Sequence, residues 1–157
     1  MRLSAAVAGT PSVAALGIVA HEVGHAAQDK LGYAPMRFRS ALVPVANLGS
    51  SFGFICVILG LILFAFNVAF GETLAWVGVC LFAAAVLFAL VTLPVEYNAS
   101  SRARQMLQAT GLVSVKEYQG ASAVLSAAAL TYVAALLQAV AQLFFFILLV
   151  GGMGRRS

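Results

Sequence analysis

Both histidines of the chain lie in one short motif, His21-Glu22-Val23-Gly24-His25, which has the pattern HExxH. On a helix, residues four apart project from the same face, so the two imidazoles can bind a single Zn²⁺. Zinc lowers the pKa of a bound water towards neutrality, and Glu22 can accept the proton as that water attacks a peptide carbonyl. The motif therefore predicts a zinc site with His21 and His25 as ligands and Glu22 as general base.

A second interpretation is that His21 and His25 are packed core histidines with Glu22 as their salt-bridge partner. Two histidines and a glutamate at metal-binding spacing, in a chain with only 9% charged residues, favour the metal site. Gly24 fits either helix packing or a close approach of the elements that form the site. Packing alone is sufficient to explain it.

A third ligand is needed, because a catalytic zinc usually has three protein ligands and one open position. The remaining acidic residues are Asp29, Glu72, Glu96 and Glu117. Asp29 is expected to point along the histidine helix towards solvent, and Glu72 to lie across the membrane. Glu117 is expected to form a surface pair with its neighbour Lys116. Glu96 is the candidate that remains.

Glu96 has alternative roles of its own. It could mark the membrane boundary, or it could pair with Arg102 or Arg104. Asn98 and Ser100, which follow it closely, are candidates for hydrogen bonds that orient the metal ligands. Tyr132 could stabilise an oxyanion or anchor a span at the interface, and Tyr118 is expected at a surface or interface.

The elements that must position these residues are predicted to be membrane helices. The composition is 62% apolar, and no charged residue occurs in 40–71, 73–95 or 118–154. Each of these stretches exceeds the roughly 20 residues that cross a bilayer as a helix. We therefore predict an all-α integral membrane bundle with about three transmembrane helices, at about 45–70, 73–95 and 124–150. Residues 1–157 are expected to form a single membrane-embedded domain.

The HExxH helix is predicted at about 11–31, buried in protein at the membrane face because its second half is too polar for lipid. Thr10 is the expected N-cap with Pro11 at the first helical position, and Gly32 is the expected stop. Residues 32–40 are predicted to be a basic connector.

Later in the chain, Gly71-Glu72 is predicted to form a tight turn. Pro94 is expected to kink or loosen the end of the second span. Residues 96–117 are expected to form a polar helical segment broken at Thr110-Gly111. Cys56 and Cys80 fall within spans and indicate no disulfide framework.

The distribution of charge predicts the orientation. With three crossings, seven of the nine basic residues fall on the side that carries the histidine helix, which is cytoplasmic by the positive-inside rule. The basic residues are too thinly spread to indicate nucleic-acid binding. The expected partners are the lipid bilayer and a peptide or membrane-protein substrate, and the sequence indicates no oligomeric state.

Several longer motifs resemble the YugP-like neutral zinc metallopeptidases of bacterial membranes. They are the run from Ala14 into HEVGHAAQ, then GYAPMRFRSALVPVANLGS, LVTLPVEYNASSRA and AALTYVAALLQA. The resemblance implies a gluzincin-like peptidase of the bacterial cell membrane with His21 and His25 as zinc ligands, Glu22 as general base and Glu96 as third ligand. The layout is similar to that of the HtpX-like membrane proteases.

The resemblance also implies two departures. Family members usually carry an N-terminal span and a further polar segment before the position of Arg2, and Asn98 stands where Asp is commoner. The primary hypothesis is a membrane-bound zinc metallopeptidase. The alternative is a catalytically impaired, truncated pseudo-protease or a non-enzymatic membrane interaction protein that retains a metal site. A metal transporter is disfavoured because transport sites lie near the midplane of the spans.

Overall fold

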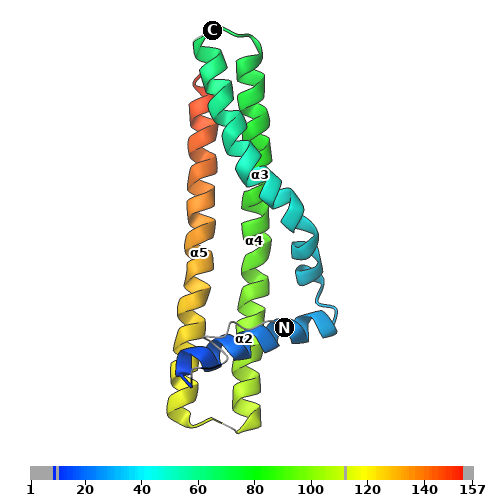
Figure 1. The fold of residues 1–157 in the computed structure, drawn as a ribbon, viewed down its shortest axis with the longest axis vertical. Helices are drawn as coiled ribbons and strands as arrows, with labels where there is room; N and C mark the ends of the chain where they lie inside the picture. Colours follow the sequence, from blue (N-terminus) through cyan, green and yellow to red (C-terminus); the bar gives the residue numbers. More distant parts are fainter. Residues whose placement is uncertain (1–8, 10, 112, 154–157) are drawn as a thin grey trace. The chain divides into compact units, whose positions relative to one another are not determined.

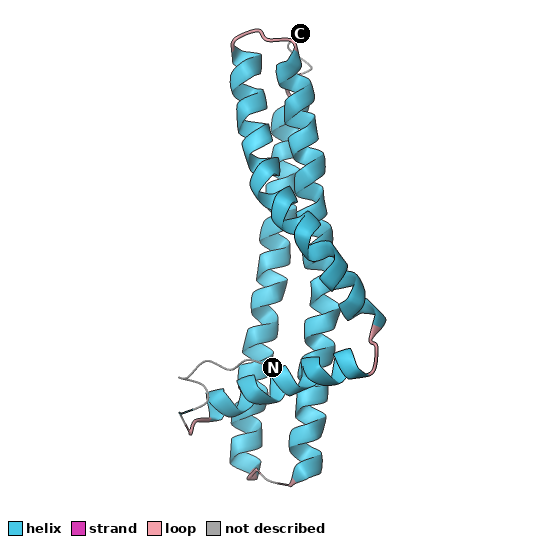
Figure 2. Ribbon diagram, turned by 45° about the vertical axis from the view of Figure 1, so that its right-hand side comes forward, coloured by secondary structure: helices cyan, strands magenta, loops and turns pink. Residues whose placement is uncertain are grey.

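The chain folds into helices joined by short loops. The computed structural model describes residue 9 and residues 11–111 and 113–153, and these residues contain no strand (Figure 2). The helices are α2 (Val13–Lys30), α3 (Ala34–Ala65), α4 (Phe70–Thr110) and α5 (Val115–Gly151) (Figure 1). Within the described part of the chain, α3, α4 and α5 are the three helices long and apolar enough to cross a membrane. The all-helical class and the three candidate spans are therefore confirmed.

The helices contribute to two compact units. The first unit contains Met1–Phe38 and Thr92–Val133, and the second contains Arg39–Val91 and Ala134–Ser157. The first unit thus combines α2 with the later part of α4 and the earlier part of α5. The second unit combines most of α3 with the earlier part of α4 and the later part of α5.

Small residues bring α3 and α4 together in the second unit. Gly60 is buried, and a β-carbon there would collide with the backbone of Ala75 on α4. Gly53 and Gly78 face each other in the same way. Helices in an apolar solvent associate mainly through such close van der Waals contact, because lipid supplies no hydrophobic driving force. The buried apolar cluster of this unit consists of Val57, Ala75, Val79, Phe146, Val150 and Met153.

In the first unit, α2 lies across α4 and α5 (Figure 1). Gly17 of α2 packs on α5, where an added β-carbon would lie 3.3 Å from the carbonyl oxygen of Ala121. The buried cluster of this unit draws on all three helices and consists of Ala20, Ala103, Leu107, Ala121 and Leu125. This packing holds the histidine helix against the two long helices.

Helix α2 begins later than the sequence indicated. Its N-cap is Ser12, which has extended backbone angles and whose hydroxyl accepts a hydrogen bond from the Ala15 N–H at 3.1 Å. Thr10, the expected N-cap, lies outside the described residues. Serine is at least as favourable an N-cap as threonine. Because α2 begins at Val13, the expectation that Pro11 occupies the first helical position is wrong. The expected stop at Gly32 is confirmed, with a φ of 64°.

Helix α3 begins at Ala34, so the expected connector over 32–40 is mostly helical. The Tyr33 carbonyl accepts hydrogen bonds from the N–H groups of Met36 and Arg37. Pro35 in the first turn does not interrupt the helix, because the N–H groups there have no intrahelical partner.

The tight turn expected at Gly71-Glu72 is wrong. The chain turns between Ala65 and Phe70, with Asn67 in the left-handed region at a φ of 59°. Asparagine adopts this conformation more readily than most residues. Gly71 is instead a buried packing position in α4, where a β-carbon would meet the backbone of α3.

Helix α4 runs without interruption through Pro94 and the polar segment that the sequence set apart. It ends at Thr110, before Gly111 with a φ of 60°, so the expected break at Thr110-Gly111 is confirmed. Beyond Pro94 one face of α4 is buried in the first unit, which includes Glu96, Ala99 and Ala103. Tertiary packing thus compensates for the hydrogen bond that proline cannot make.

Replacing Gly60 by alanine tests the contact between α3 and α4. The added methyl group has no room beside Ala75, so we expect the Gly60→Ala protein to lose about 1–3 kcal/mol of stability. Thermal unfolding of the purified protein in detergent measures the loss. Gly151→Ala is the matched control, because nothing lies within 4 Å of a β-carbon there. Equal unfolding temperatures for the two variants would contradict the close contact.

Candidate metal centre

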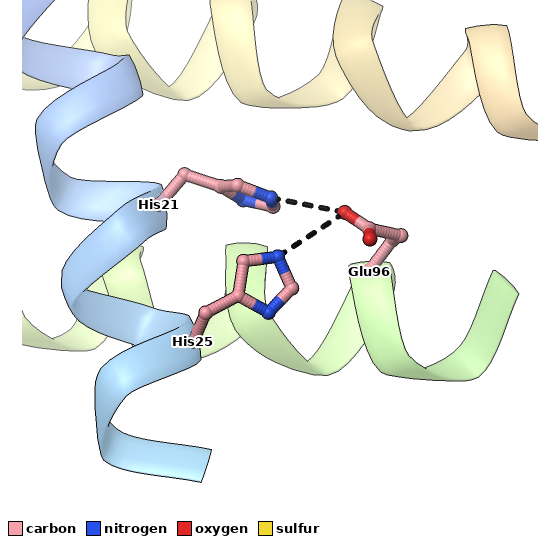
Figure 3. A group of neighbouring side chains, drawn as sticks. All are labelled: His21, His25 and Glu96. Atoms are coloured by element: carbon pink, nitrogen blue, oxygen red, sulfur yellow. Dashed lines mark hydrogen bonds and ion pairs between the residues drawn. The ribbon is translucent and has the colours of Figure 1, made fainter. Parts of the chain in front are cut away.

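Three side chains from two helices converge in the first unit. His21 and His25 project from α2 towards Glu96 on α4 (Figure 3). The Oε2 atom of Glu96 lies 3.0 Å from Nε2 of His21 and 3.4 Å from Nε2 of His25. The two imidazole rings meet edge to face, with centroids 4.6 Å apart. The structure therefore brings together the three residues that the sequence suggested as metal ligands.

The Glu96 carboxylate is nearly inaccessible to water, with only 2% of the side chain exposed, whereas each histidine is 17% exposed. A buried carboxylate is costly unless a cation or hydrogen-bond donors compensate its charge. A divalent cation between the carboxylate and the two imidazoles would supply that compensation. The partial exposure of the two histidines leaves the centre some contact with solvent.

The spacing of the donor atoms fits a zinc ion. One nitrogen of each histidine and one oxygen of Glu96 all lie within 4.8 Å of one another. Zinc binds nitrogen and oxygen at about 2.0–2.2 Å in tetrahedral geometry, which separates its ligand atoms by roughly 3.3–3.5 Å. The 3.4 Å distance from Glu96 to His25 lies within this range and the 3.0 Å distance to His21 is a few tenths of an ångström shorter, so small movements would accommodate the ion.

Gly24 sets how close the histidine helix comes to α4. It lies between the two histidines and is buried, and a β-carbon there would collide with the carbonyl group of Ala99. Both interpretations of Gly24 from the sequence, packing and close approach of the site's elements, therefore describe the same contact. Since Ala99 is three residues after Glu96, this contact also brings the carboxylate within reach of the imidazoles.

The nitrogens that face away from Glu96 are also held. The His21 Nδ1 lies 3.1 Å from the hydroxyl oxygen of Ser100, as the sequence suggested for that serine. The His25 Nδ1 lies 2.9 Å from Oε1 of Gln28. Asn98 contacts Gln28, not a histidine, at 3.0 Å. Each imidazole is thus held in its orientation by a contact at Nδ1, the ring nitrogen that faces away from Glu96.

Gln28 is the residue that sequence reasoning missed. It has no exposed surface, although glutamine is usually found at the protein surface. Its position three residues after His25 is the signal that could have found it, because residues at this spacing share a helix face. Within the HExxH pattern itself nothing points to it.

The other acidic residues have different environments. Asp29 is exposed on α2, as expected. Glu117 accepts hydrogen bonds from the N–H and the hydroxyl of Ser114 at 2.8 and 2.6 Å, and so caps the start of α5. The sequence interpretation expected a surface pair with Lys116 and missed this capping role. Glu72 lies in the first turn of α4.

The basic residues considered as partners of Glu96 are engaged elsewhere. Arg102 donates to Asn98 at 2.8 Å, and Arg104 donates to Ser122 and Ser126 on α5. Tyr118 packs against the apolar cluster of the first unit, and Tyr132 is half-buried on α5. Glu22 is half-buried beside His21.

Fold and centre together define a helical protein with three candidate membrane spans and an HExxH helix whose histidines meet a buried carboxylate. Residues 1–151 match the family described as "Putative neutral zinc metallopeptidase", and the chain belongs to this family. It is 41% identical over 149 residues to the "Putative membrane protease YugP" of Bacillus subtilis (strain 168). The match covers 95% of the chain and 64% of that relative's length. No solved structure gives a significant match. The YugP-like resemblance is thus confirmed.

Gly24→Ala tests the contact that brings α2 to α4. We expect the methyl group to push the two helices apart, to lower stability by about 1–3 kcal/mol and to weaken zinc retention, because the histidines move away from Glu96. Thermal unfolding and the zinc content after dialysis are the measurements. Gly151→Ala is again the control, since nothing lies within 4 Å of a β-carbon there. Equal zinc retention in the two variants would refute the role of Gly24.

Proposed function

We propose that the protein is a membrane-bound zinc metallopeptidase in which His21, His25 and Glu96 hold the metal and Glu22 is the general base. The observation that carries the proposal is the convergence of two Nε2 atoms of an HExxH helix on one buried carboxylate oxygen. The family description and the name of the Bacillus subtilis relative support the same chemistry. The ligand set, two histidines on one helix and a glutamate on another, is the gluzincin-like arrangement that the sequence suggested.

The chain's own residues have separate tasks in this mechanism. When bound, zinc supplies a Lewis acid that polarises the substrate carbonyl and acidifies water. Glu22, adjacent to the ligand His21, accepts the proton of the attacking water and returns it to the leaving nitrogen. Ser100 and Gln28 hold the two imidazoles from behind. The low exposure of Glu96 keeps bulk water from competing for its carboxylate.

The substrate is proposed to be a peptide bond in membrane or misfolded proteins. Glu96 is the first charged residue after the apolar run 73–95, and it lies on the same helix, α4. This position, where a candidate span meets polar sequence, supports a substrate that emerges from the bilayer. The positive-inside distribution of Lys and Arg supports a cytoplasmic location for it.

Substituting the proposed base separates chemistry from metal binding. We expect Glu22→Gln to reduce cleavage of casein or a membrane-protein substrate by about 10²–10⁴-fold while zinc content stays at the wild-type value. Glu96→Ala is the comparison variant and should lose zinc as well as cleavage, because it removes a ligand. Undiminished cleavage by the Glu22→Gln protein would sink the mechanism. Zinc bound by a wild-type protein that cleaves nothing would instead favour a non-enzymatic membrane protein with a metal site.

The proposed orientation is tested by thiol labelling in intact bacterial cells. In a protein with Cys56 and Cys80 replaced by alanine, single cysteines are introduced at Asp29 on α2 and at Phe66 between α3 and α4. Both positions are exposed. We expect a membrane-impermeant maleimide to label Phe66→Cys in intact cells and Asp29→Cys only after permeabilisation. The reverse pattern would place the metal centre on the outer face.

A further inference from the structure

We propose that Gln28 is a positioning residue of the metal centre, which holds His25 in the tautomer with its proton on Nδ1 and so keeps Nε2 unprotonated, as a metal ligand must be. The inference rests on the proposed function and concerns a residue outside the HExxH pattern. Gln28 is fully buried and bridges α2 to α4 within the first unit. A fixed tautomer matters because a metal binds only the unprotonated ring nitrogen.

The surroundings of Gln28 allow only one orientation of its amide. Its Nε2 lies 2.8 Å from the backbone oxygen of Val95 and 3.0 Å from Oδ1 of Asn98. A backbone carbonyl can only accept, so the atom of Gln28 that faces Val95 must be the nitrogen. The two hydrogens of the amide are then used by these two acceptors. The oxygen of Gln28 is consequently the atom that faces His25.

The orientation of Asn98 is fixed independently. The Nε–H of Arg102 can only donate, and it lies 2.8 Å from Oδ1 of Asn98. The Asn98 atom facing Arg102 must therefore be the oxygen, and the same oxygen accepts from Gln28. The Arg102 guanidinium can only donate, and the Val95 carbonyl can only accept. Together these two groups determine the orientations of the Asn98 and Gln28 amides.

This arrangement determines the proton position on His25. The Gln28 oxygen, an acceptor only, lies 2.9 Å from Nδ1 of His25, so that nitrogen must carry a hydrogen. In a neutral imidazole Nε2 then has a free lone pair, and this atom lies 3.4 Å from Oε2 of Glu96. The hydrogen bond at Nδ1 also fixes the plane of the ring.

His21 is held differently. Its Nδ1 lies 3.1 Å from the hydroxyl oxygen of Ser100, and a hydroxyl can either donate or accept. Both tautomers of His21 therefore remain compatible with Ser100. The Nε2 of His21 lies 3.0 Å from Oε2 of Glu96, which accepts when ionised, so these contacts do not leave the metal-facing nitrogen of His21 unprotonated in the way that Gln28 does for His25.

The tautomer can be measured without any metal. The chain contains two histidines, so after ¹⁵N-histidine labelling and metal-free purification in detergent a His21→Gln variant assigns the His25 signals. At alkaline pH, where imidazole is neutral, we expect the His25 proton on Nδ1. A proton on Nε2 would overturn the inference. This spectrum decides the role of Gln28 even if the wild-type protein binds no zinc, a result that would refute only the proposed function.

Variants of Gln28 then test its effect on the metal. Gln28→Met keeps the length of the side chain but removes the acceptor, so we expect mixed His25 tautomers and a zinc affinity about 10–100-fold weaker in chelator competition. Gln28→Glu keeps an acceptor facing Nδ1 but removes the donor to Val95 and Asn98, so we expect the Nδ1 proton to persist in the folded protein at a lower unfolding temperature. Gln105→Met, at an exposed glutamine of α4, should change neither the tautomer nor the zinc affinity.

A purely structural Gln28 would give a different outcome. In that case Gln28→Met would lower the unfolding temperature but leave the His25 tautomer and the zinc affinity of the folded protein at wild-type values, and the inference would be wrong. If Gln28→Met does not fold, the wild-type spectrum and the Gln28→Glu variant decide. Loss of the Nδ1 proton in Gln28→Glu would also overturn the proposal.

Discussion

The carboxylate of Glu96 is shielded from water, and the first unit is organised around the need to compensate its charge. A carboxylate with 2% of its side chain exposed cannot rely on solvent. Two imidazole nitrogens face it, and both come from one helix, so docking of α2 against α4 determines whether the charge is compensated. The same need favours a cation at this position over an anion or a neutral ligand, either of which would leave the carboxylate uncompensated.

Close packing and directed hydrogen bonds make that docking specific. Gly24 permits backbone contact with Ala99, which no larger residue would allow without displacing the helix. Gln28 connects α2 to the backbone of α4 and leaves its own amide only one orientation. Contacts between apolar side chains tolerate small shifts, whereas these polar contacts do not, because amide and carbonyl groups must meet at defined angles. The unit thus combines a non-specific apolar cluster with a few positions that fix the helix register.

The sequence was sufficient to predict the helical class and the three candidate spans, because a long stretch without charged residues is disfavoured in water and forms a helix in lipid. It also suggested the histidines and Glu96 as partners, from the HExxH spacing and from the scarcity of acidic residues; the structure places them together, and their role as ligands stays a prediction. Helix ends were less predictable. Capping and packing decide where the helices begin and end, as Ser12, Asn67 and the first residues of α3 show. Gln28 was overlooked because its role depends on Val95 and Asn98, which are distant in sequence.

The two halves of the centre are far apart in the chain, since His21 and Glu96 are separated by 75 positions. A ribosome releases the histidine helix first, and both α3 and most of α4 must follow before the carboxylate is available. During this interval the histidine pair has no carboxylate partner, and a zinc ion would find an incomplete ligand set. Glu96 can meet the two histidines only after most of α4 has been made, so a nascent chain would lack this arrangement of three side chains until then.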